Sequence, residues 1–203
     1  MRVREAVEQM KKEMSYARFL AGFLLVASPW VAVAGDRTID TEHSTLKIDV
    51  GNAGLFSAAG HEHSVTAQLV GGSLNDGDSP QVVFTVDARK LMLVEDNKLS
   101  VEQQAEVQRT MQAKVLQSEI YPLISFHSTK VKNGVNRWIV SGELTLHGQS
   151  RSIQAEVHDS AEGYTGRSKI KQTDFGINPV SVAGGVVKVK DELEIQFVIV
   201  PIR

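Results

Sequence analysis

The sequence predicts an all-β protein, an antiparallel β-barrel of about eight strands with one helix between two of the strands. After residue 34, short segments alternate between apolar and polar side chains, which is the period of a strand with one buried face. Gly, Asn, Asp and Pro separate these segments, as expected of hairpin turns between neighbouring strands. Seven or eight such strands can close into a barrel, which removes exposed sheet edges and leaves room for side chains or one small ligand.

The apolar face of each expected strand can be followed along the chain. Residues 38–50 alternate through Ile39, Leu46 and Ile48, and residues 64–74 follow after a Gly-rich link. The later strands are marked by apolar residues at alternate positions: Val82, Phe84 and Val86; Ile124 and Phe126; Trp138, Val140, Leu144 and Leu146; Ile153, Ala155 and Val157; Leu193, Ile195, Phe197 and Ile199.

Residues 100–118 break this alternation and predict the helix. Val101, Ala105, Met111 and Val115 recur at roughly helical spacing, and Ser100 with Gln103 forms a capping-box pattern. In an otherwise β chain such a helix could cover the mouth of the barrel or pack against its outer wall. The sequence leaves both arrangements open.

Residues 1–34 read as a secretory signal peptide. The apolar run 19–33 follows Arg18, falls short of the roughly 20 residues needed to span a bilayer, and ends in Ala32-Val33-Ala34. We expect cleavage before Gly35, a mature domain of residues 35–203, and a periplasmic location. The charged stretch before Arg18 is long for a signal peptide, and we expect Met14 to be the true start.

Charge and cysteine content exclude several classes of protein. Cleavage removes five Lys/Arg and three Asp/Glu, which leaves 17 basic and 21 acidic residues without a basic run. Nucleic-acid binding is therefore not expected, because it needs clustered positive charge. The chain has no cysteine, which excludes disulfides and thiolate chemistry.

Four phrases along the chain carry a resemblance to a known family. They are Ile39-Asp-Thr-Glu-His-Ser-Thr-Leu46, Tyr121-Pro-Leu-Ile-Ser-Phe126, Gly142-Glu-Leu-Thr-Leu-His-Gly148 and Thr173-Asp-Phe-Gly-Ile177. In this order and spacing they resemble the YceI-like family of small secreted lipocalin-like barrels, over about residues 37–203. The resemblance implies a barrel that holds a polyisoprenoid lipid.

The expected function is that of a periplasmic binding or carrier protein rather than an enzyme. The sequence contains no Gly-rich phosphate loop, no Gly-x-Ser-x-Gly and no His-Glu-x-x-His. The resemblance points to a polyisoprenoid of the quinone or polyprenyl type, whereas barrel physics alone equally admits other long-chain lipids. No cofactor is expected, transient contact with a membrane is compatible with this role, and the sequence does not determine the oligomeric state.

His61 and His63 carry the main alternative, a metal-dependent enzyme. On a strand these two side chains point to the same side and could share one Zn²⁺, but the sequence supplies no third ligand. We expect no metal there and instead a structural or pocket role for both histidines. A third alternative is a packed barrel without ligand that serves in stress response or protein interaction.

The expected pocket is lined by large apolar side chains. We expect Phe84, Phe126, Trp138 and Leu144 to face the ligand. Met92, Met111 and Leu116 are expected near the mouth, where the flexible thioethers would adapt to a flexible lipid. His147 and Asp174-Phe175-Gly176 are expected to be structural, the first in a hairpin turn and the second at the end of a strand.

Overall fold

The structure is a computed structural model that describes residues 36–53, 63–182 and 187–202. These residues belong to one compact unit, residues 33–203. The predicted signal peptide and His61 lie outside the described residues.

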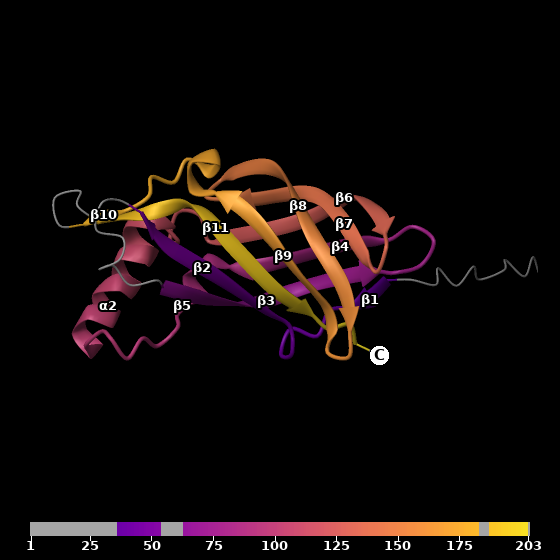
Figure 1. Cartoon of the computed structure of the whole chain (residues 1–203), viewed down its shortest axis with the longest axis horizontal. Coiled ribbons are helices and arrows are strands. Elements are labelled where there is room, and N and C mark those ends of the chain that lie inside the picture. Colours follow the sequence, from indigo (N-terminus) through magenta and orange to yellow (C-terminus); the bar gives the residue numbers. More distant parts are fainter. Residues whose placement is uncertain (1–35, 54–62, 183–186, 203) are drawn as a thin grey trace, which may run out of the picture. The chain divides into compact units, whose positions relative to one another are not determined.

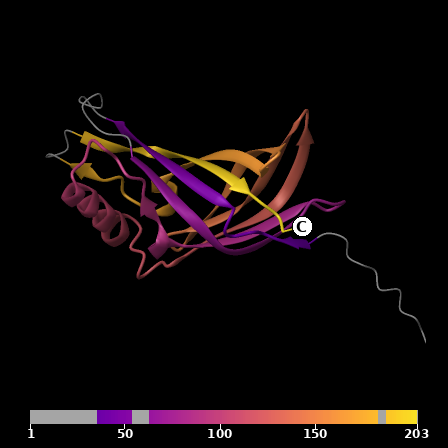
Figure 2. The same cartoon turned by 90° about the horizontal axis from the view of Figure 1, so that it is seen from below.

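Eight long strands form a closed antiparallel barrel, which confirms the predicted fold class (Figures 1 and 2). Each strand pairs with the next along the chain, and the last strand pairs with the first and so closes the barrel. The strands are β2 (Thr45–Ala53), β3 (His63–Asn75), β4 (Gln81–Asp87), β6 (Leu123–Gly134), β7 (Arg137–Leu146), β8 (Gln149–Ser160), β9 (Gly163–Lys171) and β11 (Val187–Ile199).

Short elements complete the sheet and its connections. The strands β1 (Asp36–Thr38) and β5 (Met92–Leu93) pair with β3, and β10 (Ser181–Val182) pairs with β11. The 3-10 helices η2 (Ala88–Lys90) and η4 (Gln172–Phe175) follow β4 and β9.

The expected first strand, residues 38–50, is interrupted. The Asp40 carboxylate accepts hydrogen bonds from the backbone N–H groups of Glu42 (3.0 Å) and His43 (3.1 Å), and this fixes a turn over residues 41–43. The turn separates β1 from β2. Ser44, the buried residue after the turn, accepts a hydrogen bond from Val200 N–H (2.9 Å), and this bond connects the turn to the C-terminal segment after β11.

The predicted helix is present as α2 (Val101–Thr110), followed by one π-helical segment, η3 (Met111–Val115). The capping box is confirmed, because Ser100 Oγ accepts from Gln103 N–H and Gln103 Oε1 accepts from Ser100 N–H. Figure 1 shows α2 at the end of the barrel where β5 and β10 lie. We call this the helix end, and the opposite end, with the β3–β4, β6–β7 and β8–β9 turns, the hairpin end.

Candidate functional site: a cavity through the barrel

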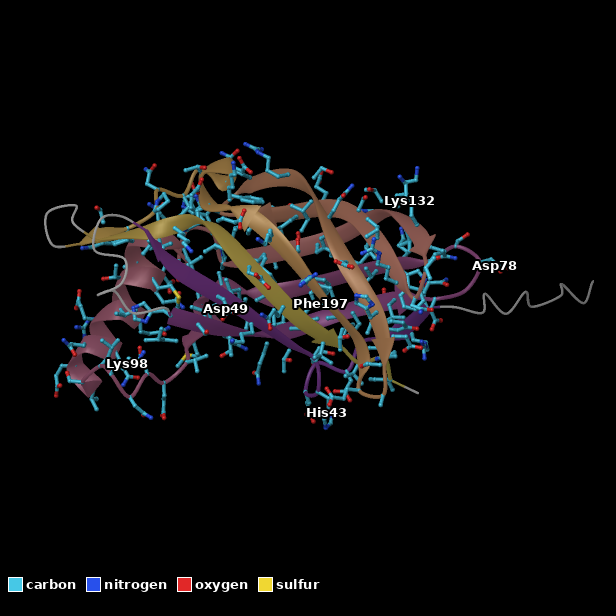
Figure 3. All side chains as sticks on the ribbon, in the orientation of Figure 1. His43, Asp49, Asp78, Lys98, Lys132 and Phe197 are labelled. Carbon is cyan, nitrogen blue, oxygen red and sulfur yellow. The ribbon has the colours of Figure 1, made fainter. Side chains whose placement is uncertain are left out.

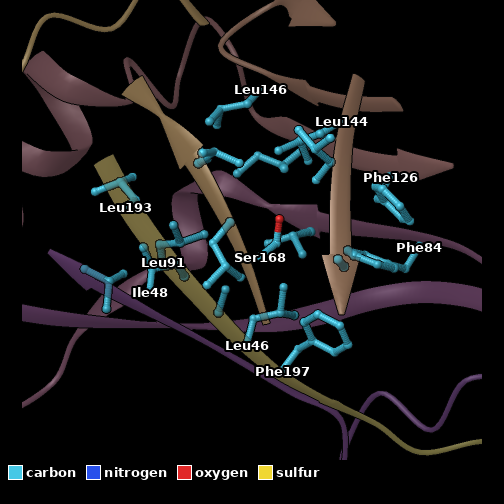
Figure 4. Close-up of a pocket in the computed structure, with 18 of the residues that line it drawn as sticks. Leu46, Ile48, Phe84, Leu91, Phe126, Leu144, Leu146, Ser168, Leu193 and Phe197 are labelled. Atoms are coloured by element: carbon cyan, nitrogen blue, oxygen red, sulfur yellow. The ribbon is translucent and has the colours of Figure 1, made fainter. Parts of the chain in front are cut away.

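The barrel encloses a cavity of about 1360 Å³, lined by all eight long strands and by the helix (Figure 4). This is larger than the roughly 300–1,000 Å³ of ordinary small-molecule pockets. Its lining runs from the hairpin end, with Tyr164, to the helix end, with Met111. The shape therefore suits a long ligand rather than a compact one.

The wall of the cavity is the inward face that the alternation predicts. On β4, β7, β8 and β11 the apolar lining residues recur at alternate positions, and most of the residues between them are polar. Every apolar residue assigned to one face of these four strands lines the cavity: Val82, Phe84 and Val86; Trp138, Val140, Leu144 and Leu146; Ile153, Ala155 and Val157; Leu193, Ile195, Phe197 and Ile199.

Many of these inward-facing side chains are only partly buried. Ile48, Leu193 and Phe197 pack against the core cluster and yet keep accessible surface, although they line the cavity (Figure 4). Protein interiors are close-packed and leave few voids larger than a water molecule. The accessible surface therefore belongs to an open lumen, which contradicts the alternative of a fully packed barrel.

Glycines in the wall keep the phenylalanine rings out of the lumen. A Cβ at Gly142 would lie 2.4 Å from Phe126 Cζ, and a Cβ at Gly166 would lie 2.4 Å from Phe197 Cζ. Each ring thus lies over a glycine of a neighbouring strand, against the wall. The sequence shows both glycines but gives no sign of which ring lies over which glycine, because the partners come from different strands.

The middle of the lumen is uncharged. Its buried polar side chains are Ser168, whose hydroxyl donates to Gln154 O (2.8 Å), and Gln172, whose amide donates to Lys190 O (2.8 Å). Both groups use backbone acceptors, so they do not require a polar ligand. Such a lumen favours an apolar chain.

A polar cluster lies beside the cavity at the hairpin end. The Tyr164 hydroxyl donates to Asp76 (2.7 Å), Arg37 contacts both groups, and the Trp138 ring packs edge-on against Tyr164 at 5.9 Å between centroids. The hydrogen bond from Tyr164, with the charge of Arg37, lowers the pKa of Asp76 below its ordinary value. Burial and Asp76 together raise the pKa of Tyr164 to about 12.

The helix closes the other end of the cavity. Val107, Met111 and Val115 line it, and two glutamines fasten the helix to the segment after β4. Gln108 donates to Leu91 O (2.8 Å) and accepts from Leu93 N–H (2.8 Å), while Gln112 also donates to Leu91 O (3.0 Å). Of the two arrangements left open by the sequence, the structure shows the helix covering the mouth.

The structure places most of the predicted pocket residues on the cavity wall. Those that line it are His63, Phe84, Met111, Leu116, Phe126, Trp138 and Leu144. Met92 is misplaced in the prediction: it is 56% exposed and pairs with Thr66, which is also exposed, whereas the next residue, Leu93, lines the cavity. Their contact with a ligand remains a prediction.

Three residues of the quoted phrases, Tyr121, His147 and Phe175, meet outside the cavity lining. The Tyr121 ring packs on His147 at 4.4 Å between centroids, and His147 Nδ1 lies 3.2 Å from Phe175 O. His147 and Gly148 both have positive φ, 52° and 70°, as a two-residue hairpin turn between β7 and β8 requires. The structural role expected of His147 is therefore present. Asp174 and Phe175 belong to η4, which follows β9 directly, and Gly176 ends η4 with a positive φ of 71°, so this phrase ends a 3-10 helix rather than a strand.

The described part of the chain offers no group of three or more His, Cys, Asp or Glu residues that could hold a metal ion. His63 lies at the helix end of the lumen, with Nδ1 4.0 Å from an Asp96 carboxylate oxygen. The metal-site alternative also involves His61, which lies outside the described residues. Across the same residues, helices are too short or too polar to span a membrane.

Comparisons with known proteins agree with this architecture. The family model described as the YceI-like domain matches residues 38–200. A UPF0312 protein of Vibrio cholerae is 27% identical over 175 residues, which cover 80% of this chain and 88% of the relative.

Two solved structures share the fold. BcnA of Burkholderia cenocepacia has a TM-score of 0.55 and 17% identity, and the match covers 79% of this chain and 98% of BcnA. A polyisoprenoid binding domain from Saccharophagus degradans, implicated in plant cell wall breakdown, has a TM-score of 0.53 and 14% identity, over 80% of this chain and 95% of that domain.

Proposed function

Because the chain belongs to the YceI-like family, we propose that it is a binding or carrier protein that holds a long apolar lipid, an isoprenoid, in its lumen without chemical turnover. The description of the Saccharophagus degradans domain as polyisoprenoid-binding supports the choice of isoprenoid. The observation that carries the proposal is the open apolar lumen of about 1360 Å³.

Burial of an apolar tail can by itself provide enough binding free energy for micromolar affinity. Ligands of useful size gain up to roughly 0.3 kcal/mol per heavy atom, so one five-carbon isoprene unit contributes about 1.5 kcal/mol. A few buried units would reach an affinity of about 1 μM. The tail requires no polar partner, since the polar groups in the middle of the lumen are already hydrogen-bonded.

The proposed site of action is the periplasm, on the basis of residues 1–34. The intact mass of the exported protein tests this part. We expect a chain that starts at or near Gly35, and a mass that retains residues 14–34 would contradict it.

The test of binding uses protein purified from its own periplasm. Native mass spectrometry should show an added mass that organic extraction removes and identifies as an isoprenoid. Delipidated protein should then bind a fluorescent long-chain probe, and geranylgeraniol should displace it. Failure of the protein to bind any long apolar chain would refute the proposal.

A further inference from the structure

We propose that the lumen selects isoprenoids with an uncharged head group, such as a prenol or a quinone, over prenyl diphosphates, and that this head group lies at the hairpin end. The inference rests on the proposed lipid binding. The preference for an uncharged head group follows from the positions of the charged side chains along the cavity.

Charged side chains line only the two ends of the cavity. At the hairpin end they are Asp76, Asp78 and Asp159, and at the helix end they are Glu106 and Lys114, with His63. Between the ends, the described lining residues carry no charge. A diphosphate drawn into this lumen would lose its hydration without a counter-charge, which is strongly unfavourable. The head group must therefore lie at one of the ends.

The charged residues that line the cavity at the hairpin end are all carboxylates, and Lys132, which also lies at this end (Figure 3), is not part of the lining. Arg37 is engaged by Asp76 and by the Tyr164 hydroxyl, so its charge is already compensated. Asp78 and Asp159 make no ion pair with any described residue. Diphosphate sites gather arginine and lysine side chains, whereas two free carboxylates repel an anion.

The same end offers uncharged hydrogen-bonding groups. Asn75, Gln81 and Asn133 belong to the cavity lining, together with Trp138 and Tyr164. Asn75 already donates to Asp36 (3.2 Å) and accepts from Gly77 N–H (2.9 Å), and Gln81 Nε2 lies 3.2 Å from His127 Nε2, whereas the Asn133 carboxamide has no hydrogen-bond partner among the described residues. Carboxamides donate and accept hydrogen bonds, so they can serve a hydroxyl or a quinone carbonyl without opposing charge. The aromatic side chains and the carboxamides beside them fit the boundary between a lipid tail and an uncharged head group.

Among the described lining residues, the helix end provides Lys114 and His63 as its cationic groups. Its lining is largely apolar, with Val107, Met111 and Val115 across the opening. Lys114 makes no ion pair with a described residue, and Glu106, which also lines this end, is already paired with Arg109. His63 in turn lies beside Asp96. Among the described lining residues this end thus offers one unpaired lysine, whereas diphosphate sites gather several cationic side chains, so this end suits the far end of the tail.

The test compares three ligands that share an isoprenoid character and differ in the head: geranylgeraniol, a short-tailed ubiquinone and geranylgeranyl diphosphate. Displacement of a fluorescent probe from delipidated protein gives their affinities at low and at physiological salt. We expect the alcohol and the quinone to bind at least about ten-fold more tightly than the diphosphate at low salt. The gap should narrow at higher salt, because exposed charges are screened.

Charge-neutralising variants locate the head group. The double variant Asp78→Asn/Asp159→Asn should strengthen diphosphate binding several-fold and leave geranylgeraniol binding unchanged. The matched control Glu143→Gln, at an exposed position that is not part of the cavity lining, should change neither. Equal or tighter binding of the diphosphate, or discrimination unaltered in the double variant, would overturn the inference. Loss of binding for all three ligands would instead refute the proposed function.

Discussion

Single glycines determine how open the lumen is. The clash distances at Gly142 and Gly166 show that Phe126 and Phe197 occupy the space that a Cβ would take. Two rings that would otherwise project into the barrel thus lie along its wall. The volume for a ligand depends on these pairs as much as on the number of strands.

We predict that Gly142→Ala lowers the free energy of unfolding by about 1–3 kcal/mol, because the new methyl group would also lie 2.6 Å from His127 O. The displaced Phe126 ring should narrow the lumen and weaken lipid binding. Gly71→Ala is the matched control, since its Cβ would meet no atom closer than 3.9 Å. Thermal and urea unfolding measure the difference, and equal destabilisation by both substitutions would contradict the argument.

Tyr164 should titrate well above an ordinary tyrosine, near pH 12, because burial and the Asp76 carboxylate disfavour its phenolate. Since the folded pKa is raised, the stability that Tyr164 contributes is complete below about pH 10 and is lost as the pH rises through about 12. Absorbance titration of the phenolate measures this. The late step should vanish in Tyr164→Phe and move to lower pH in Asp76→Asn, and a late step that persists in Tyr164→Phe would exclude the assignment.

The helix α2, which we call the lid helix because it covers the mouth of the barrel, is held in place by polar contacts more than by apolar packing. No residue of α2 is buried, and Val101 is 78% exposed. Gln108 and Gln112 instead hydrogen-bond to the backbone of Leu91 and Leu93. Segments with few buried contacts open at a lower free energy than the core, so α2 suits the passage of a ligand.

We predict that Gln108→Ala loosens this lid. Loss of two hydrogen bonds lowers the opening free energy of residues 101–115 by about 1–3 kcal/mol, with a smaller effect on the whole barrel. Hydrogen–deuterium exchange of this segment should accelerate, and bound lipid should dissociate faster. Ala105→Gln, at an exposed position of the same helix, is the control. Unchanged exchange in Gln108→Ala would show that the glutamine does not hold the lid.

The sequence could predict the barrel and the inward faces of most strands, because the period-two pattern is local. It could not predict the turn at residues 41–43, which depends on one carboxylate, Asp40, within an apparently continuous strand. Met92 was misplaced for a related reason, since a strand of two residues is too short to show an alternation. The openness of the lumen is a property of contacts between strands, such as Gly166 with Phe197, and has no local signature.

Because the lumen is open, the free energy of unfolding of the whole barrel should depend on whether a lipid is bound in it. The barrel has no disulfide and no free sheet edge among its eight long strands, so packing must hold it together. Half-buried residues such as Ile48, Ile195 and Phe197 lack neighbours on the lumen side. A lipid would supply those contacts, and saturation at 100 times the dissociation constant would add about 2.7 kcal/mol of stability.

A substitution that fills the lumen with a larger side chain distinguishes a ligand cavity from a packed core. Ile195 lines the cavity and is only partly buried, so Ile195→Trp adds its ring to empty space. In a packed core this enlargement would lower stability by about 1–3 kcal/mol. We expect instead a nearly unchanged or raised melting temperature for the delipidated protein, together with loss of isoprenoid binding. Gln196→Trp, on the exposed side of the same strand, should leave binding intact. A large drop in melting temperature with full lipid affinity would mean that the lumen is not where the lipid binds.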